Sequence, residues 1–300
     1  MSKLFKVGGF FIGVGILTMV GAGIASGNWS DLYGSTNRYN AVDPYHSSEN
    51  ITMIDIDASN RRIVLAPTNE ETVYVTYFES DFDRIEVTET NEVLKIMNPI
   101  DWQARFIFSF DWFTDTDART IYVYIPISGT FAVDAYTQNG AISMANIENP
   151  LTIQAKTLNG SVNLNQLPNV ASVKAESSNG SISVTRTVIS GSLDVKTSNG
   201  SITISTQSSA STLKATTSNG FVRVSETTAT SYEIDSSNGS VELSAPGPID
   251  DYYVSLHTNL GSVFLNGVKT TTYNYGNIAA PKQIDMSTNN GDVKLRFVNN

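Results

Sequence analysis

The sequence predicts an all-β protein, a β-solenoid of about 20-residue coils that follows a single N-terminal transmembrane helix. Three observations support this. An Asn-Gly pair recurs at a fixed period, the residues on both sides of it alternate between apolar and polar, and one uncharged apolar stretch lies near the N-terminus. Fixed-period self-similarity is typical of stacked architectures, and alternation with a period of two is typical of strands.

The repeated phrase is clearest at 193–204, LDVKTSNGSITI. Its corner pairs recur in steps of 20, 20, 20, 20 and 19 residues, at Asn139, Gly140, Asn159, Gly160, Asn179, Gly180, Asn199, Gly200, Asn219, Gly220, Asn238 and Gly239. Looser copies follow at Gly261 and Gly291, and two early copies at 54–65 and 85–96 keep the asparagine without the glycine. We interpret the pairs as structural corners, since Asn-Gly tolerates positive φ.

Two architectures fit such a phrase, a meander of hairpins and a solenoid in which each repeat is one coil. A meander would leave an apolar face without a covering layer. Stacking the coils also produces outward columns in which charges alternate in sign: Asp134, Gln154, Lys174, Asp194, Lys214 and Glu233. Across a hairpin the same charges find no partners, so the solenoid is favoured.

Two further columns follow from the same alignment. An inward apolar column runs Val133, Ile153, Val173, Leu193, Leu213, Tyr232, Val254 and Ile284. A hydroxyl column runs Thr137, Thr157, Ser177, Thr197, Thr217, Ser236, Thr258 and Thr288. We expect these hydroxyls and the corner asparagines to hydrogen-bond the corner backbone and each other in ladders.

The chain divides into four parts: a cytoplasmic stub and membrane anchor at 1–26, an extended tether at 27–50, irregular coils with an aromatic cap at 51–130, and the regular solenoid at 131–300. The 19 apolar residues 7–25 would span about 28 Å as a helix, close to the hydrocarbon thickness of a bilayer. Lys3 and Lys6 predict a cytoplasmic N-terminus and an extracytoplasmic repeat domain in a single-pass cell-membrane protein. The alternative is secretion after cleavage of a signal peptide.

Composition excludes several chemistries. No cysteine is present, so disulfides and thiolate chemistry are ruled out, and a net charge of −10 argues against nucleic acid and anionic lipid as partners. His46 lies in the tether and His257 in a late coil, where we expect it beside Asp235, and neither has an evident acid–base partner. The spacing of Asp111, Asp115 and Asp117 matches no calcium loop. We therefore expect no catalytic, cofactor-binding or metal-binding residues.

One aromatic segment is the candidate contact surface. Its alternating rings are Trp102, Phe106, Phe108, Phe110 and Trp112. They form either a cap over the solenoid or an exposed patch that stacks on sugar rings or contacts a protein.

The repeated TSNGSITI phrase resembles the putative-adhesin β-repeat family of bacterial envelope proteins, which includes the LiaG-like proteins. The segments IDIDASN, IVLAP, VLKI and IYVYIP carry the resemblance further, over about residues 50–298. The resemblance implies a right-handed β-helix-like fold on an exported or membrane-attached chain, and for LiaG-like members a connection with envelope stress.

Three functions remain open at this point. The first is a non-catalytic, adhesin-like binding or scaffold module that contacts a cell-wall polymer. The second is an accessory of an envelope-stress response that acts through a membrane protein. The third, a polysaccharide-degrading β-helix enzyme, lacks paired carboxylates on one face, because lysines separate them.

Overall fold

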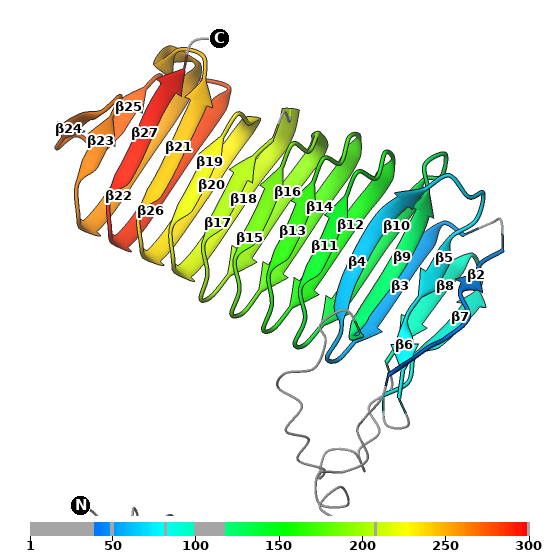
Figure 1. Cartoon of the computed structure of the whole chain (residues 1–300). Coiled ribbons are helices and arrows are strands. Elements are labelled where there is room, and N and C mark those ends of the chain that lie inside the picture. Colours follow the sequence, from blue (N-terminus) through cyan, green and yellow to red (C-terminus); the bar gives the residue numbers. More distant parts are fainter. Residues whose placement is uncertain (1–38, 49–50, 81–82, 99–117, 207–208, 299–300) are drawn as a thin grey trace, which may run out of the picture.

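The described strands wind into a flattened solenoid with two long sheets facing each other (Figure 1). The structure is a computed structural model, and it describes residues 39–48, 51–80, 83–98, 118–206 and 209–298. Among these residues the only helical element is one turn of 3-10 helix, η2, at Ile249–Asp251. The predicted all-β class is therefore confirmed for the described chain.

The first long sheet has 12 strands. Their spatial order is β25 (Asn274–Gly276), β22 (Tyr252–Leu260), β26 (Lys282–Asn290), β20 (Thr228–Asn238), β18 (Ser209–Asn219), β16 (Ile189–Thr197), β14 (Val170–Ser177), β12 (Pro150–Thr157), β10 (Phe131–Thr137), β3 (Met53–Ala58), β8 (Val93–Met97) and β7 (Glu86–Thr90).

The second long sheet has 13 strands. Their order is β2 (Tyr45–His46), β5 (Tyr74–Thr76), β9 (Thr120–Pro126), β4 (Arg62–Thr68), β11 (Ile142–Ala145), β13 (Val162–Asn165), β15 (Ile182–Thr185), β17 (Ile202–Ser205), β19 (Val222–Ser225), β21 (Val241–Pro246), β27 (Val293–Val298), β23 (Val263–Leu265) and β24 (Val268–Thr270). A small pair of strands, β1 (Asn40–Ala41) and β6 (Phe78–Glu79), lies outside both sheets.

Each regular coil contributes one strand to each sheet, and successive coils pair in parallel. The predicted outward column is confirmed residue by residue, for example Lys174 opposite Asp194 and Asp194 opposite Lys214. The alternate residues point inward, where Val173, Leu193 and Leu213 are each only 1% exposed. Burying such side chains on both sheets stabilises the stack by roughly 1.5–3 kcal/mol per residue.

The corners are held by two ladders of side-chain hydrogen bonds. The amide ladder begins at Asn60 Oδ1, which accepts from Asn139 Nδ2. Each later asparagine donates from Nδ2 to Oδ1 of the one in the adjacent coil, and the distances along the ladder are 2.5–2.9 Å, through Asn139, Asn159, Asn179, Asn199, Asn219, Asn238 and Asn290. The hydroxyl column bonds to the corner backbone, as expected. Its members donate to corner backbone carbonyls of the adjacent coil, as Thr197 does to Gly180 O at 2.8 Å, and not to each other.

Coil order departs from chain order at both ends of the stack. At the N-terminal end, β3 and β4 lie between β10–β11 on one side and the later strands β8 and β9 on the other. At the C-terminal end, β26 and β27 lie between β20–β21 and the earlier strands β22 and β23. The expected contact of His257 with Asp235 is therefore wrong, because Ser287 stands between them and donates to Asp235.

The early copy at 85–96 also needs correction. It is an antiparallel hairpin of β7 and β8, not a coil, and its turn residues Asn91 and Glu92 have φ of 51° and 63°. Two positive φ angles in a two-residue turn are typical of a type I′ hairpin. Only β8 continues the parallel stack, through its pairing with β3.

Part of the segment expected as a tether is attached to the solenoid. Strand β1 pairs with β6, and β2 pairs with β5. The expected anchor at 1–26 lies outside the described residues, and within the described ones no helix has the length and apolar character needed to cross a membrane.

Candidate binding surface

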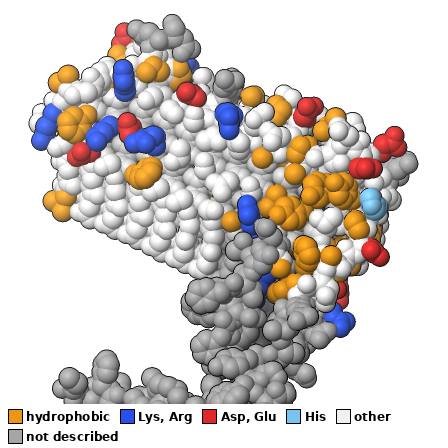
Figure 2. Space-filling model, viewed as in Figure 1, with side chains coloured by type: hydrophobic (Ala, Val, Ile, Leu, Met, Phe, Trp, Pro, Cys, Tyr) orange, Lys and Arg blue, Asp and Glu red, His pale blue; other side chains and the backbone are white. Residues whose placement is uncertain are grey.

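The two outer faces of the solenoid carry different chemistry. The outer face of the 12-stranded sheet bears charges that pair between coils, such as Lys156 with Glu176 at 3.7 Å. On the 13-stranded sheet, the outward residues of the middle strands β11–β17 are uncharged: Ser143, Ala145, Asn163, Asn165, Ser183, Thr185, Thr203 and Ser205. Figure 2 shows this flat uncharged stretch between hydrophobic side chains at one end and charged ones at the other.

Aromatic rings stand in a row at the hydrophobic end. His46, Tyr74 and Tyr124 lie directly opposite one another on β2, β5 and β9, and Tyr122 lies two residues from Tyr124. The Tyr74 and Tyr124 rings stack with centroids 4.3 Å apart and an interplanar angle of 14°. Ring centroids of His46 and Tyr74 are 5.5 Å apart, and those of Tyr122 and Tyr124 are 6.3 Å apart. We call these four residues the aromatic stripe.

Strand pairing fixes the stripe in place. Val75 and Val123 point into the core, so the residues that alternate with them, Tyr74 and Tyr124, must point outward. Stacked cross-strand aromatic pairs stabilise one another by roughly 0.2–1 kcal/mol. Burial, together with the neighbouring tyrosines, raises the pKa of Tyr124 above its ordinary value of 10.0, so its hydroxyl is protonated and able to donate at neutral pH.

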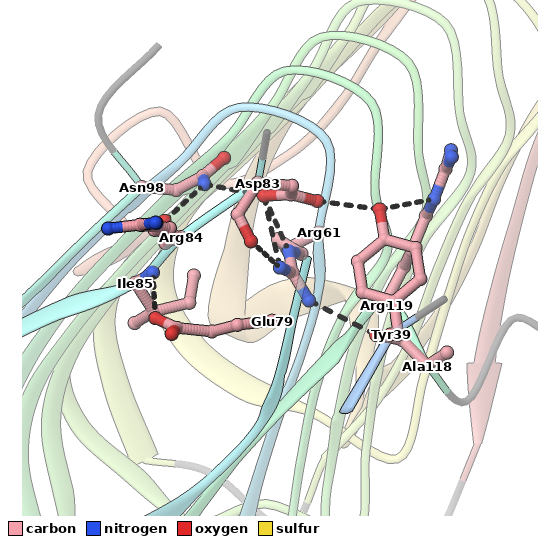
Figure 3. Close-up of polar contacts among 9 residues, drawn as sticks. All are labelled: Tyr39, Arg61, Glu79, Asp83, Arg84, Ile85, Asn98, Ala118 and Arg119. Atoms are coloured by element: carbon pink, nitrogen blue, oxygen red, sulfur yellow. Dashed lines mark hydrogen bonds and ion pairs between the residues drawn. The ribbon is translucent and has the colours of Figure 1, made fainter. Parts of the chain in front are cut away.

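A buried polar cluster lies at the same end of the solenoid (Figure 3). Arg61 is fully buried, and its guanidinium contacts Asp83 Oδ1 at 3.0 Å and donates to Ala118 O at 3.1 Å. Tyr39 donates to Asp83 Oδ2 at 2.8 Å, and its ring packs beneath the guanidinium groups of Arg61 and Arg119. Burial and the Asp83 carboxylate raise the pKa of Tyr39.

This cluster joins segments that are distant in the sequence. Asn98 donates to Asp83 Oδ1 at 2.8 Å, and Arg119 donates to the Tyr39 hydroxyl at 3.1 Å. Arg61 occupies the corner position that glycine occupies in later coils. From this position the Arg61 side chain donates a hydrogen bond to the Ala118 carbonyl. Tyr39, Arg61, Asp83 and Asn98 bond to one another or to nearby backbone carbonyls, so the cluster is suited to fixing the start of the domain against the first coils.

The predicted contact residues Trp102, Phe106, Phe108, Phe110 and Trp112 lie outside the described residues. The corner asparagines lie in the amide ladder described above, and the corner glycines lie against the carbonyl of the adjacent corner. The aromatic stripe was not predicted. Its signal is present in VYVTY and IYVYIP as the tyrosines that alternate with the apolar residues. Within the described ranges, no group of three or more His, Asp or Glu side chains could hold a metal ion.

The fold and its outer faces define a class of protein, a two-sheet β-solenoid with a flat, uncharged stretch in the middle of one face. More particularly, the chain belongs to the Toastrack DUF4097 family, which it matches over residues 51–296. The resemblance to a putative-adhesin β-repeat family is thereby confirmed.

Solved structures similar to this chain include two bacterial proteins. One is a putative cell adhesion protein from Clostridium sporogenes ATCC 15579, with 9% identity and a TM-score of 0.27, covering 87% of this chain and 100% of that one. The other is a putative adhesin from Bacteroides fragilis NCTC 9343, with 12% identity and a TM-score of 0.44, covering 88% of this chain and 98% of that one. Comparison with curated proteins gives no match.

Proposed function

We propose that this protein is a non-catalytic, adhesin-like binding module of the bacterial cell envelope that holds a wall glycan through the aromatic stripe. The observation that carries the proposal is the row of fixed, partly exposed rings formed by His46, Tyr74, Tyr124 and Tyr122. Exposed aromatic groups of this kind offer apolar faces and edges for sugar rings, with hydroxyls at their tips for hydrogen bonds.

The adjoining uncharged face supports the same ligand. Hydroxyl and amide side chains of β11, β13, β15 and β17 repeat at the strand spacing of about 4.8 Å, so they form a regular grid of donors and acceptors. A neutral polymer that leaves the stripe along the sheet passes Arg62 on β4 and then meets this grid. At the edge of the grid, Arg186 donates to Asn165 and Glu226 accepts from Ser205. Residues 1–26 would attach the module to the cell membrane, with the repeats on the outside.

The test is co-sedimentation of the full chain, held in a nonionic detergent, with isolated bacterial cell walls. The variant replaces Tyr74 and Tyr124 by serine, and the matched control replaces Tyr136 by serine on the outer face of the other sheet. If each ring contributes about 1 kcal/mol, the double variant binds walls about 30-fold more weakly and the control is unchanged. Melting temperatures establish that all three proteins are folded.

Equal wall binding by the wild type and the double variant would contradict the role of the stripe. If no form binds walls, co-purification with an envelope membrane protein becomes the expected result, and the accessory function in an envelope-stress response replaces adhesion. Lipid vesicles in a parallel sample report binding that depends on membrane alone.

A further inference from the structure

Four basic residues from three strands gather on the 13-stranded sheet at the end opposite the aromatic stripe. Arg223 lies on β19, Lys294 and Arg296 lie on β27, and Lys269 lies on β24. The pairing Arg223–Glu242–Lys294–Phe264–Lys269 places them along one row across five strands, with Arg296 two residues further along β27. We call these four residues the cationic end.

Carboxylates balance only part of this charge. Arg223 pairs with Glu242 at 3.2 Å, and Lys294 lies 3.8 Å from Asp292. Glu226 lies at the corner that follows β19 and accepts a hydrogen bond from Ser205. Ser205 is on β17, on the side of β19 that faces away from Lys294, so Glu226 is directed away from the other cations. Neither Arg296 nor Lys269 has a carboxylate within 4.0 Å among the residues that the structure describes.

The other outer face shows the contrast. Four of its lysines lie near carboxylates of their own or an adjacent strand, in the pairs Lys174–Glu176, Lys156–Glu176, Lys95–Asp55 and Lys214–Glu233. Lys196 lies opposite Glu176 and has no carboxylate within 4.0 Å among the described residues. The cationic end therefore holds exposed positive charge on a chain whose net charge is −10. Such a local excess selects an anionic ligand in spite of the overall charge.

Aromatic rings position two of the cations. The Arg223 guanidinium lies 5.5 Å from the centroid of the Phe221 ring, and the Lys294 ammonium lies 5.9 Å from the centroid of the Phe264 ring. Contacts of this kind hold the long side chains against the sheet, which lowers the entropy lost when a ligand binds.

We propose that the cationic end binds a linear phosphate-bearing polymer. The row from Arg223 to Lys269 spans four strand spacings, about 19 Å, which a single phosphate cannot bridge but a chain of phosphates can. Arg296 supplies two parallel N–H donors suited to one phosphate, and Lys269 supplies a point charge for another. This site extends the proposed binding function and does not require that the aromatic stripe bind anything.

The experiment uses the full chain in a nonionic detergent and fluorescently labelled inorganic polyphosphate of one defined length, followed by anisotropy across a salt series. The variant replaces Arg296 and Lys269 by glutamine. We expect about tenfold weaker binding at 0.1 M salt, and a slope of log K against log salt that is smaller by about 1.4. Orthophosphate competes only at far higher concentration than the polymer.

The matched control replaces Lys174 and Lys196 by glutamine, which removes the same charge from the outer face of the other sheet. It binds polyphosphate within about twofold of wild type if the site is specific. The Tyr74 and Tyr124 serine variant also binds normally, so failure of the aromatic stripe and failure of this site give different results.

Three outcomes would overturn the proposal. Equal weakening in both charge variants would indicate diffuse attraction without a site. Orthophosphate competing as well as polyphosphate would indicate an isolated anion site. Phosphatidylglycerol bicelles that displace polyphosphate equally well would assign the cationic end to a membrane surface in place of a polymer.

Discussion

Glycine is needed at the corners because neighbouring coils approach too closely to leave room for a side chain. A requirement for positive φ, which is the usual reason for glycine, is not the cause here. Gly140, Gly160, Gly180 and Gly200 do not have positive φ. A Cβ at any corner glycine from 140 to 239 would lie 1.8–2.2 Å from the backbone carbonyl oxygen of the adjacent corner. The hydroxyl column donates to the same carbonyls, so corner backbone, hydroxyl and glycine form one tightly packed unit.

Replacing Gly180 by alanine therefore tests the packing of the corner. The new Cβ would meet Gly160 O at 1.8 Å, and because the atom it meets is backbone, the two coils must separate. We expect a loss of about 3 kcal/mol in the free energy of unfolding, measured by urea denaturation. Thr203→Ala, on the outer face, should change it by less than about 0.5 kcal/mol. Equal effects would show that the corner has room to relax.

The backbone conformation at the second corner of the coils could not be predicted from the residue types found there. Asn146, Gln166, Arg186, Glu226 and Asn266 all have φ between 50° and 59°, and all five are spaced by 20 residues or a multiple of it. Only asparagine among these residue types favours the left-handed region. The conformation is imposed by the closing of the coil, so residue identity carries little signal of it.

At the scale of elements, the strands and their facing could be predicted from the sequence, but the order of the coils could not. The phrase around Asn259 and the phrase around Asn290 present the same apolar, hydroxyl and amide positions to a neighbour. Either could pair with the coil that contains Asn238, and the structure selects Asn290. The hairpin of β7 and β8 was missed for a similar reason, since alternation is the same in a coil and in a hairpin.

Equivalence of the coils predicts that one can be removed. Deleting residues 141–160 joins Gly140 to Ser161 in the same phase and brings Asp134 opposite Lys174, an attractive pair. We expect a folded protein with native circular dichroism and a small loss of stability, because each coil contacts only its neighbours. Deleting 141–150 alone breaks the phase and should abolish cooperative melting. A folded product from the shorter deletion would contradict coil-by-coil stacking.

The aromatic stripe belongs to this scale too. Tyr74 and Tyr124 meet only because β5 turns back antiparallel onto β9, while β9 runs parallel to β4. Sequence alternation predicts that both tyrosines point outward, but their meeting depends on a pairing between strands about 50 residues apart. The polar cluster around Arg61 was hidden in the same way, since its partners Tyr39, Asp83 and Ala118 come from separate segments.

Considered as a whole, the solenoid is a rod whose core contains buried phenols at the C-terminal end. Tyr232 donates to Thr227 O at 2.7 Å, and Tyr252 donates to Pro246 O at 2.7 Å. Burial strongly raises the pKa of Tyr232 and also raises that of Tyr252. The folded state therefore holds these protons more tightly than the unfolded state does.

The sign of the pH effect follows directly. An unfolded tyrosine ionises near pH 10, so the contribution of these phenols is complete below that pH and is lost as pH rises above it toward the raised folded pKa. We expect the urea midpoint to fall steadily above about pH 10. In Tyr232→Phe the fall should be shallower, although the variant is less stable at pH 7 because a buried amide, Ala229 N, loses its partner. An unchanged slope would contradict the assignment.

The antiparallel strands at both ends of the solenoid affect whether two molecules can associate end to end. A stack that ended on a regular parallel coil would expose an edge ready to receive the first coil of another molecule, and fibres would grow. Here the outermost strands are β7 and β2 at one end and β25 and β24 at the other, and all four pair antiparallel with their inner neighbours. Among the strands that the structure describes, an incoming parallel coil finds no matching edge at either end, so a chain with such regular repeats can remain a single molecule.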